Sequence, residues 1–331
     1  MPDKAQIYAQ MADDTARKIT GDYLDWATFL STSSRLYKYP FHDQLLIYAQ
    51  RPEATACATY DLWNDTMRRY VRRGSKGIAL LTPSTSGMSL RYVFDVSDTG
   101  TRQNSRNVEP WALSDDTEMP VRQMLEDQYY ADASAGLIQQ IDQIAQQQAL
   151  AYWRDHARDI RDSVDSSALM DYDDFSIGAS FRKAAAASIS YSIQTRCGLE
   201  PELFREDFTE VLDWNTPATV AELGKAVSEI SGQILRQIET TVRTAERSMN
   251  HERTELQEER RLPSAGHGPD RSGAQTPGQV RDHEAAVPGA EPARPVHEAD
   301  PQRQADGASP GDRHDGARQA GEPDEPADEA A

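Results

Sequence analysis

Residues 58–81 have the sequence ATYDLWNDTMRRYVRRGSKGIALL, and the hydrophobic pattern changes within this stretch. Its first part fits a short helix, whereas residues 78–81 are an apolar run of the kind that forms a strand. The alternating, β-rich segment LRYVFDV, residues 90–96, is expected to pair with that run as a hairpin. We expect Pro83 to end the first strand and residues 84–88 to form a loop.

Helices are expected on the N-terminal side of this hairpin. Residues 3–19 fit a short helix, Asp22 can cap a second one, and residues 41–50 and 60–65 fit two more. Together these patterns predict a small α+β domain, in which helices come first and the hairpin follows.

A long helical region follows from about residue 119. Its last helix is the clearest, because Asn215 or Thr216 can cap it and Pro217 in its first turn has no N–H to leave unpaired. The expected helices are 119–130, 135–162, 175–196 and 217–247.

The last expected helix carries one continuous apolar stripe. This stripe fits packing inside the chain, against the helix that holds Phe181 and Ile189, and it also fits a dimer seam. Packing inside the chain is preferred, because an amphipathic helix usually faces its own core. The stripe consists of Val220, Leu223, Val227, Ile230, Ile234, Ile238 and Val242.

The C-terminal residues, 251–331, have a different composition. They contain no Phe, Trp, Tyr, Ile or Met and hold 10 of the 18 prolines. Such a segment cannot bury enough apolar surface to offset the entropy lost on ordering. The sequence therefore predicts an α+β domain over 1–115, a mostly α-helical accessory domain over 116–250 and a disordered acidic tail over 251–331.

Several classes of protein are excluded by composition and motifs. No apolar run approaches the roughly 20 residues that span a bilayer, and the N-terminus lacks the apolar core of a secretory signal. Cys57 and Cys197 form no metal-ligand or disulfide pattern, which favours a reducing cytoplasm. There is no HExxH, Walker A, GxGxxG or GxSxG motif, so we expect a chain without catalytic residues, metal or cofactor.

Charge is distributed unevenly along the chain, whose net charge is -19. Residues 1–100 have a net charge of +1, residues 101–250 of -11 and residues 251–331 of -9. A basic cluster on one segment is typical of a nucleic-acid-binding surface, although charge runs are commonly just solvated. Between Thr66 and Tyr92 six bases occur without an acid: Arg68, Arg69, Arg72, Arg73, Lys76 and Arg91.

Aromatic residues are interleaved with these bases. Single-stranded nucleic acids stack their bases on aromatic rings while Arg and Lys contact the phosphates, and glycines let backbone N–H groups approach a phosphate. Tyr39 and Tyr70 lie among charges and are expected to be exposed, whereas His42 and Arg51 are weaker candidates because either can bond within the fold. The candidate DNA-binding residues are Tyr39, Arg51, Trp63, Arg68, Arg69, Tyr70, Arg72, Arg73, Gly74, Lys76, Gly77 and Arg91.

Core packing is the alternative for several of these aromatic side chains. Large rings usually belong to the core, and on that ground we assign about half of them to it. The set in question is Tyr37, Phe41, Tyr48 and Trp63.

The ordered set of motifs resembles the N-terminal single-stranded-DNA-binding domain of ArdC-type antirestriction proteins. The similarity rests on residues 58–81, on LRYVFDVSDTG at 90–100 and on VEPWAL at 108–113, and it covers roughly residues 20–112. Residues 29–63 also look like the N-terminus of large helicase- and methyltransferase-containing proteins of Gram-positive conjugative elements.

The resemblance implies a non-catalytic module of a mobile genetic element that binds single-stranded DNA, with conjugation or restriction-system proteins as further partners and no membrane. It transfers no enzyme activity, because the HExxH of the ArdC-type peptidase domain is absent and because the chain holds no helicase or methyltransferase region. Two alternatives stay open: an antirestriction factor that binds a restriction enzyme through its acidic surface, and the detached targeting N-terminus of a helicase or methyltransferase.

Overall fold

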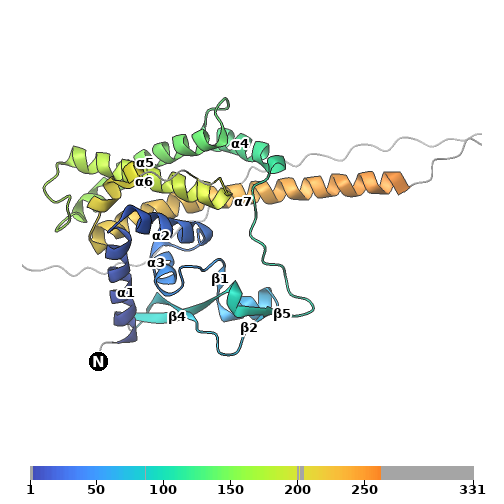
Figure 1. Cartoon of the computed structure of the whole chain (residues 1–331), viewed down its shortest axis with the longest axis horizontal. Coiled ribbons are helices and arrows are strands. Elements are labelled where there is room, and N and C mark those ends of the chain that lie inside the picture. The colour runs from blue at the N-terminus through green and yellow to red at the C-terminus, as the bar shows by residue number, and fades with distance from the viewer. Residues whose placement is uncertain (1–2, 86, 200, 202–204, 262–331) are drawn as a thin grey trace, which may run out of the picture. The chain divides into compact units, whose positions relative to one another are not determined.

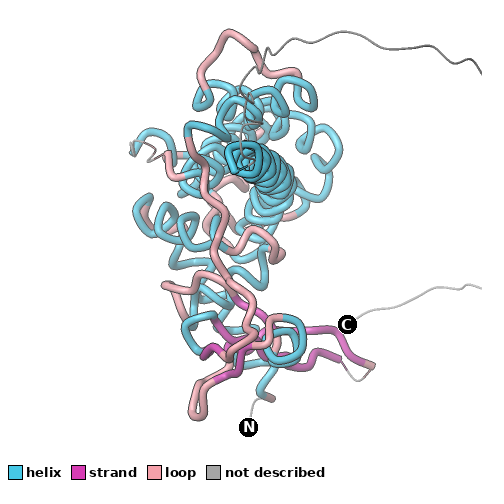
Figure 2. The backbone as a smooth tube through the Cα atoms, turned by 90° about the vertical axis from the view of Figure 1, so that its right-hand side faces the viewer, coloured by secondary structure: helices cyan, strands magenta, loops and turns pink. Residues whose placement is uncertain are grey.

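A computed structural model of the protein has two small antiparallel sheets at one end of a helical body (Figure 1, Figure 2). It describes residues 3–85, 87–199, 201 and 205–261, which all belong to one compact unit, Met1–Gly266. The boundary expected between residues 115 and 116 falls inside this unit. The expected fold class, mostly helical with a small N-terminal sheet region, is confirmed.

The N-terminal helices form where the sequence predicts them. Asp22 accepts a hydrogen bond from the Leu24 N–H at 2.8 Å and caps the second helix, as expected. The helix expected at 60–65 is present as the short π-helix η1, Leu62–Thr66. The three α-helices are α1 (Lys4–Ile19), α2 (Tyr23–Arg35) and α3 (Phe41–Gln50).

The strands form a three-stranded sheet of order β1-β4-β3 and a separate pair, β2-β5. The expected hairpin is confirmed, with Ile78 opposite Val93 in an antiparallel register. The sequence did not predict β1 and β5, because strands of two or three residues leave no periodic pattern. The strands are β1 (Cys57–Ala58), β2 (Arg69–Val71), β3 (Ile78–Ser84), β4 (Gly87–Asp95) and β5 (Thr99–Thr101).

The first hairpin strand continues through Pro83 to Ser84, so the expected strand end at Pro83 and the loop over 84–88 are wrong. The reason is that β3 is an edge strand. Ala79 directs its N–H and C=O to the Gln50 side chain, at 2.9 and 2.8 Å, and therefore away from β4. Pro83 lies four residues further and shares that outward orientation, so its missing N–H removes no bond of the sheet.

Four long helices form the rest of the body. Thr216 caps the last one, since its hydroxyl accepts from the Thr219 N–H at 3.3 Å. That helix runs to Arg261, so the first eleven residues of the expected tail are helical, and residues 262–331 of that tail lie outside the described residues. The helices are α4 (Asp115–Tyr129), α5 (Leu137–Asp162), α6 (Asp174–Cys197) and α7 (Pro217–Arg261), with 3-10 turns η2 (Val96–Asp98), η3 (Arg205–Phe208) and η4 (Glu210–Asp213).

The apolar stripe of α7 is buried inside the chain, as preferred, and packs against α6 among other helices. Gly224 lets α3 approach closely, because a Cβ at this position would overlap the Phe41 ring. Across the same core the Trp26 indole N–H donates to Ser188 Oγ at 2.8 Å and ties α2 to α6. The N-terminal helices and the later helices therefore share one core. None of the described helices is long and apolar enough to cross a bilayer.

Candidate nucleic-acid interface

The basic segment of the sequence forms β2 and the turn that leads from β2 into β3. Gly74 has a φ of 89°, which residues with a Cβ rarely adopt, and the Ser75 N–H closes the turn onto the Arg72 carbonyl at 3.1 Å. The side chains of Arg72, Arg73 and Lys76 are exposed on this turn. We call residues 56–106, which contain η1 and all five strands, the strand lobe.

Three of the expected DNA-binding bases are exposed and have no side-chain partner among the described residues: Arg68, Arg73 and Lys76. Arg68 also has a φ of 54°, an uncommon left-handed conformation for a residue other than glycine. Because these cations form no ion pair within the described structure, their donors are available for an anionic ligand.

Two further bases are partly engaged. Arg69 Nε donates to Thr99 Oγ1 at 2.8 Å, and Arg72 Nη1 donates to the Ser97 carbonyl at 2.8 Å. Thr99 is the first residue of β5 and Ser97 lies in η2 just before it, so these contacts fix the direction of the guanidinium groups relative to the β2-β5 pair. Arg72 remains exposed, whereas Arg69 is half-buried.

Arg51 and Arg91 are bound within the fold and do not join the free cations. Arg91 forms an ion pair with Asp43 of α3, and Arg51 pairs with Asp98. Burial raises the pKa of Asp43, while the adjacent Arg91 lowers it. These two arginines connect the sheet to α3, and their assignment to the DNA-binding set has no support from their contacts.

Trp63 and Tyr39 are buried or hydrogen-bonded, against the expectation that they stack on bases. Trp63 is only 2% exposed, and its indole N–H donates to the Phe94 carbonyl at 2.8 Å. The Tyr39 hydroxyl donates to the Cys57 carbonyl at 2.8 Å, and its ring packs against the core. All of the set Tyr37, Phe41, Tyr48 and Trp63 is buried, rather than half of it.

Tyr70 is exposed as expected, with 41% of its surface accessible. It lies opposite Gly100 in the β2-β5 pair, and a Cβ at Gly100 would overlap its ring. The Arg102 guanidinium lies over the same ring, 5.7 Å from the centroid. Tyr70 is thus held between a glycine and a cation.

A second group of aromatic side chains was not predicted to bind. Tyr60 and Tyr92 are 55% and 47% exposed, and Tyr60 packs edge-on against Phe94, with centroids 6.4 Å apart. Tyr92 and Phe94 occupy alternate positions of β4 and so share one face of the sheet. A Cβ at Gly77 would lie 3.2 Å from both of these side chains, so the basic turn lies directly beside them. We call Tyr60, Tyr92 and Phe94 the aromatic face.

Arg102 and Arg106 extend the basic surface. The Ser105 hydroxyl donates to the Arg68 carbonyl at 2.7 Å, and the Arg106 N–H donates to the Met67 carbonyl at 2.9 Å. These two bonds place Arg102 and Arg106 near Arg68, although Arg68 is more than thirty positions earlier in the sequence. Both arginines are exposed. The available signal was the absence of any acid between Asp98 and Glu109.

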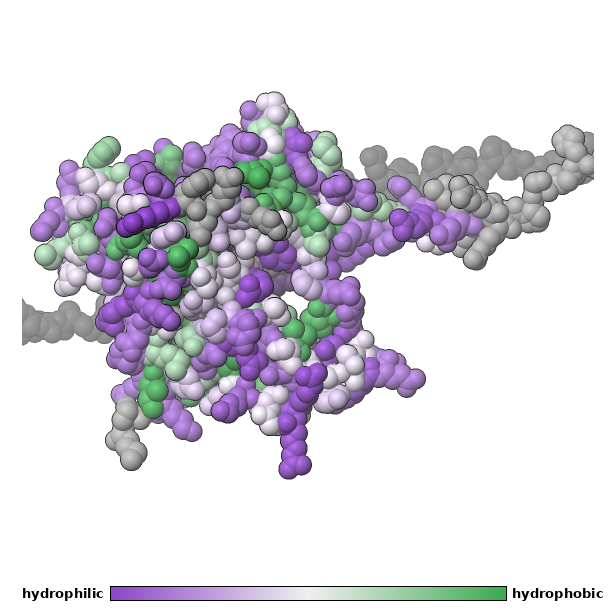
Figure 3. All heavy atoms as spheres, viewed as in Figure 1, coloured by the Kyte–Doolittle hydropathy of each residue, from purple (hydrophilic) through white to green (hydrophobic). Residues whose placement is uncertain are grey.

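The charge of the strand lobe is mixed at one edge. Asp61 and Asp65 are exposed in and beside η1, and they oppose an anionic ligand there. Asp95 is buried and structural. Burial raises its pKa, but hydrogen bonds from Ser97, Thr55 and Ala56 outweigh that effect and lower it. In Figure 3 hydrophilic side chains extend into solvent from the region of the strands.

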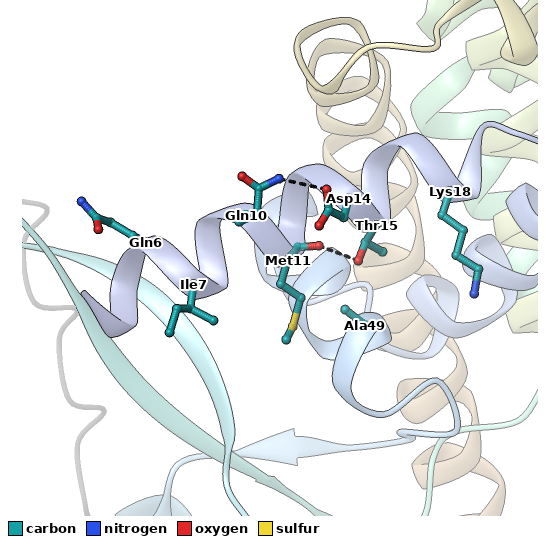
Figure 4. Close-up of a pocket in the computed structure, with 8 residues that line it drawn as sticks. All are labelled: Gln6, Ile7, Gln10, Met11, Asp14, Thr15, Lys18 and Ala49. Atoms are coloured by element: carbon teal, nitrogen blue, oxygen red, sulfur yellow. Dashed lines mark hydrogen bonds between the residues drawn. The ribbon is translucent and has the colours of Figure 1, made fainter. Parts of the chain in front are cut away.

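A separate groove on α1 lacks comparable chemistry. It has a volume of about 690 Å³ and is drawn in Figure 4. Its polar side chains bond along their own helix, Gln10 to Asp14 at 2.9 Å and Thr15 to the Met11 carbonyl at 2.7 Å. Within the described ranges, no group of three His, Cys, Asp or Glu side chains is placed to hold a metal ion.

Comparisons of the chain with protein-family models, with curated proteins and with solved structures find no match. The candidate interface rests on its own residues alone: a basic turn, a neighbouring aromatic face and an arginine-rich segment that follows β5.

Proposed function

We propose that the strand lobe binds single-stranded DNA, with the basic turn contacting phosphates and the aromatic face stacking on bases. The observation that carries the proposal is the contact of Gly77 with both Tyr92 and Phe94, which joins unpaired cations to exposed rings on one surface. Stacking platforms combined with a basic surface are the common means of binding single strands.

Single strands fit this surface better than duplexes. Paired bases keep their faces inside the stack, so exposed rings gain little from a duplex, whereas an unpaired strand offers a face to each ring. Tyr60, Tyr92 and Tyr70 present rings to solvent. Arg68 and Arg73 are close to Tyr70 in the sequence, and Lys76 precedes Gly77, which adjoins Tyr92. The proposed role is binding rather than catalysis.

The proposed setting follows from the resemblance to ArdC-type domains, which covers the whole strand lobe. It is the handling of single-stranded DNA of a mobile element in the cytoplasm, during transfer or protection from restriction.

Fluorescence-anisotropy titrations test the function. Labelled single-stranded and duplex oligonucleotides of the same sequence are titrated with protein at two salt concentrations. We expect salt-sensitive binding with a preference for the single strand, and a loss of about 1–3 kcal/mol for each ring removed in Tyr60→Ala and Tyr92→Ala. Met88→Ala, which removes an exposed apolar side chain near the hairpin turn, is the control. Equal affinity for both forms, or none for either, would overturn the proposal.

A further inference from the structure

A cleft separates the strand lobe from the helical body. It has a volume of about 340 Å³ and is bounded by residues 35–39, by the segment 107–111 and by α6 and α7. Its lining holds four cations and two carboxylates: Arg35, Lys38, Arg196, Arg243, Glu109 and Glu239. The cleft is therefore electropositive, although residues 101–250 as a whole have a net charge of -11.

Glu239 organises the cations of this cleft. Its carboxylate pairs with Lys38 Nζ at 2.7 Å and with Arg243 Nε at 3.0 Å, and it accepts a hydrogen bond from the Tyr37 hydroxyl. Burial raises the pKa of Glu239, but these three donors outweigh burial and lower it to about 2. Lys38 and Arg243 remain 57% and 42% exposed, so one partly buried carboxylate holds two cations toward solvent.

Arg196 lines the same cleft and holds the segment 107–111 in place. Its guanidinium stacks on the Trp111 ring, 3.7 Å from the centroid, and both terminal nitrogens donate to the Trp111 carbonyl at 3.0 and 3.1 Å. The Trp111 indole N–H donates in turn to the Tyr37 hydroxyl at 3.1 Å. The segment 107–111 is thus fixed against α6 and against the residues between α2 and α3.

A row of arginines continues from the cleft along α7. Arg236, Arg243 and Arg247 follow one another at helical spacings of seven and four residues and lie on one face. Thr240 lies between Arg236 and Arg243 on this face, and the acid beside it, Glu239, is the one that pairs with Arg243 and Lys38. Arg236 and Arg247 are exposed, and the row spans about 16 Å at 1.5 Å per residue. We call these three residues the α7 arginine row.

The cleft connects this row to the basic surface of the strand lobe. Met67 and Asn107 line the cleft together with Arg243, and they are the sequence neighbours of Arg68 and Arg106. Cations with exposed side chains therefore lie on both sides of one cleft, with Lys38 at its edge.

We propose that the strand bound by the strand lobe continues across this cleft, where the α7 arginine row and Lys38 contact its phosphates. The helical body then supplies part of the binding site and not only support for the lobe. This inference rests on the proposed function, and it predicts a footprint longer than the strand lobe alone provides.

Binding to oligonucleotides of two lengths tests the inference. Labelled oligothymidylates of about 6 and about 20 nucleotides, spanning the range of known site sizes, are titrated against the full chain at several salt concentrations. For the long probe, Arg236→Gln/Arg243→Gln/Arg247→Gln should reduce the salt slope by about 2, at about 0.7 per phosphate contact. Binding of the short probe, which the strand lobe accommodates, should stay unchanged.

A matched triple variant provides the control. Arg154→Gln/Arg158→Gln/Arg253→Gln removes the same charge from exposed positions away from the cleft, and it should bind both probes like the wild type. Thermal melts confirm that both variants fold. If wild type binds the long probe and the α7 variant binds it with the same slope, the inference is wrong while the proposed function stands. If wild type binds neither probe, the proposed function itself fails.

Discussion

The ring of Tyr70 lies directly on the backbone of Gly100, its partner across the β2-β5 pair. No side chain fits between them, because even a methyl group at position 100 would overlap the ring. The glycine thus sets the position of an exposed aromatic side chain, and Arg102 covers the ring from 5.7 Å. Glycines in strands commonly mark such close approaches.

Gly100→Ala should therefore destabilise the protein by about 1–3 kcal/mol, the usual cost of inserting a methyl group into a packed contact. Thermal or urea unfolding measures this change. In the Tyr70→Ala background, where the ring is absent, Gly100→Ala should lower the free energy of unfolding much less than it does in the wild type. Additive effects of the two substitutions would show that the ring does not rest on Gly100.

The stability provided by Glu239 should depend on pH. Its folded pKa of about 2 lies below its ordinary value of 4.5, so the carboxylate stabilises the fold fully above about pH 5. This contribution is lost as the pH falls toward 2. Glu239→Gln should accordingly lower the melting temperature at pH 7, and the difference from wild type should shrink between pH 5 and pH 2. A difference that is constant over this range would contradict the ion cluster.

The apolar stripe of α7 gives a sharper stability test. Ile234 is 1% exposed, and Ile234→Asp would bury an unpaired charge among the helices. A loss of about 4 kcal/mol or more, or failure to fold, is expected. Gln233→Asp places the same charge at the adjacent exposed position and should melt within a degree or two of wild type. Similar melting of the two variants would mean that the stripe faces water.

The end of α7 should contribute little to stability. Residues 251–255 and Gln257 are exposed. In Figure 1 this end of α7 extends away from the other described helices and strands. Chains truncated after Asn250 and after Arg261 should melt at the same temperature, which differential scanning calorimetry can measure. A midpoint several degrees lower for the shorter chain would show that these eleven residues pack against the folded unit.

The sequence was sufficient for features that depend on local pattern. Asp22 as a cap, the extent of α3, the hairpin of β3 and β4 and the buried stripe of α7 all follow from spacing within one segment. The end of β3 was missed because Pro83 is harmful only in a strand with neighbours on both sides, and edge position is a property of the whole sheet.

The composition of the candidate site could be predicted only in part, because contacts distant in sequence decide which charges and rings are free. In the sequence, Arg91 and Arg51 belong to the same set of candidate phosphate-binding residues as Arg73. In the structure, carboxylates 48 and 47 positions away pair with them. Trp63 is buried by a strand 31 positions later. In contrast, the alternation in LRYVFDV is a local signal that places Tyr92 and Phe94 on one face of the strand.

The basic turn provides the most direct test of DNA binding. Arg73 and Lys76 are exposed and unpaired in the described structure, so Arg73→Ala/Lys76→Ala should leave the melting temperature unchanged. Binding to every single-stranded sequence should weaken, and the salt slope should fall by about 1.4, at about 0.7 per lost phosphate contact. Anisotropy titrations from low to physiological salt measure both quantities.

Arg91→Ala is the contrasting variant: it should lower the melting temperature, because Asp43 would lose its partner, but leave the salt slope unchanged. Tyr92→Ala should reduce affinity by about 1–3 kcal/mol at a constant slope, because stacking releases no counterions. The assignment of roles would be wrong if Arg91→Ala flattened the slope as strongly as the double variant, or if Tyr92→Ala left affinity unchanged.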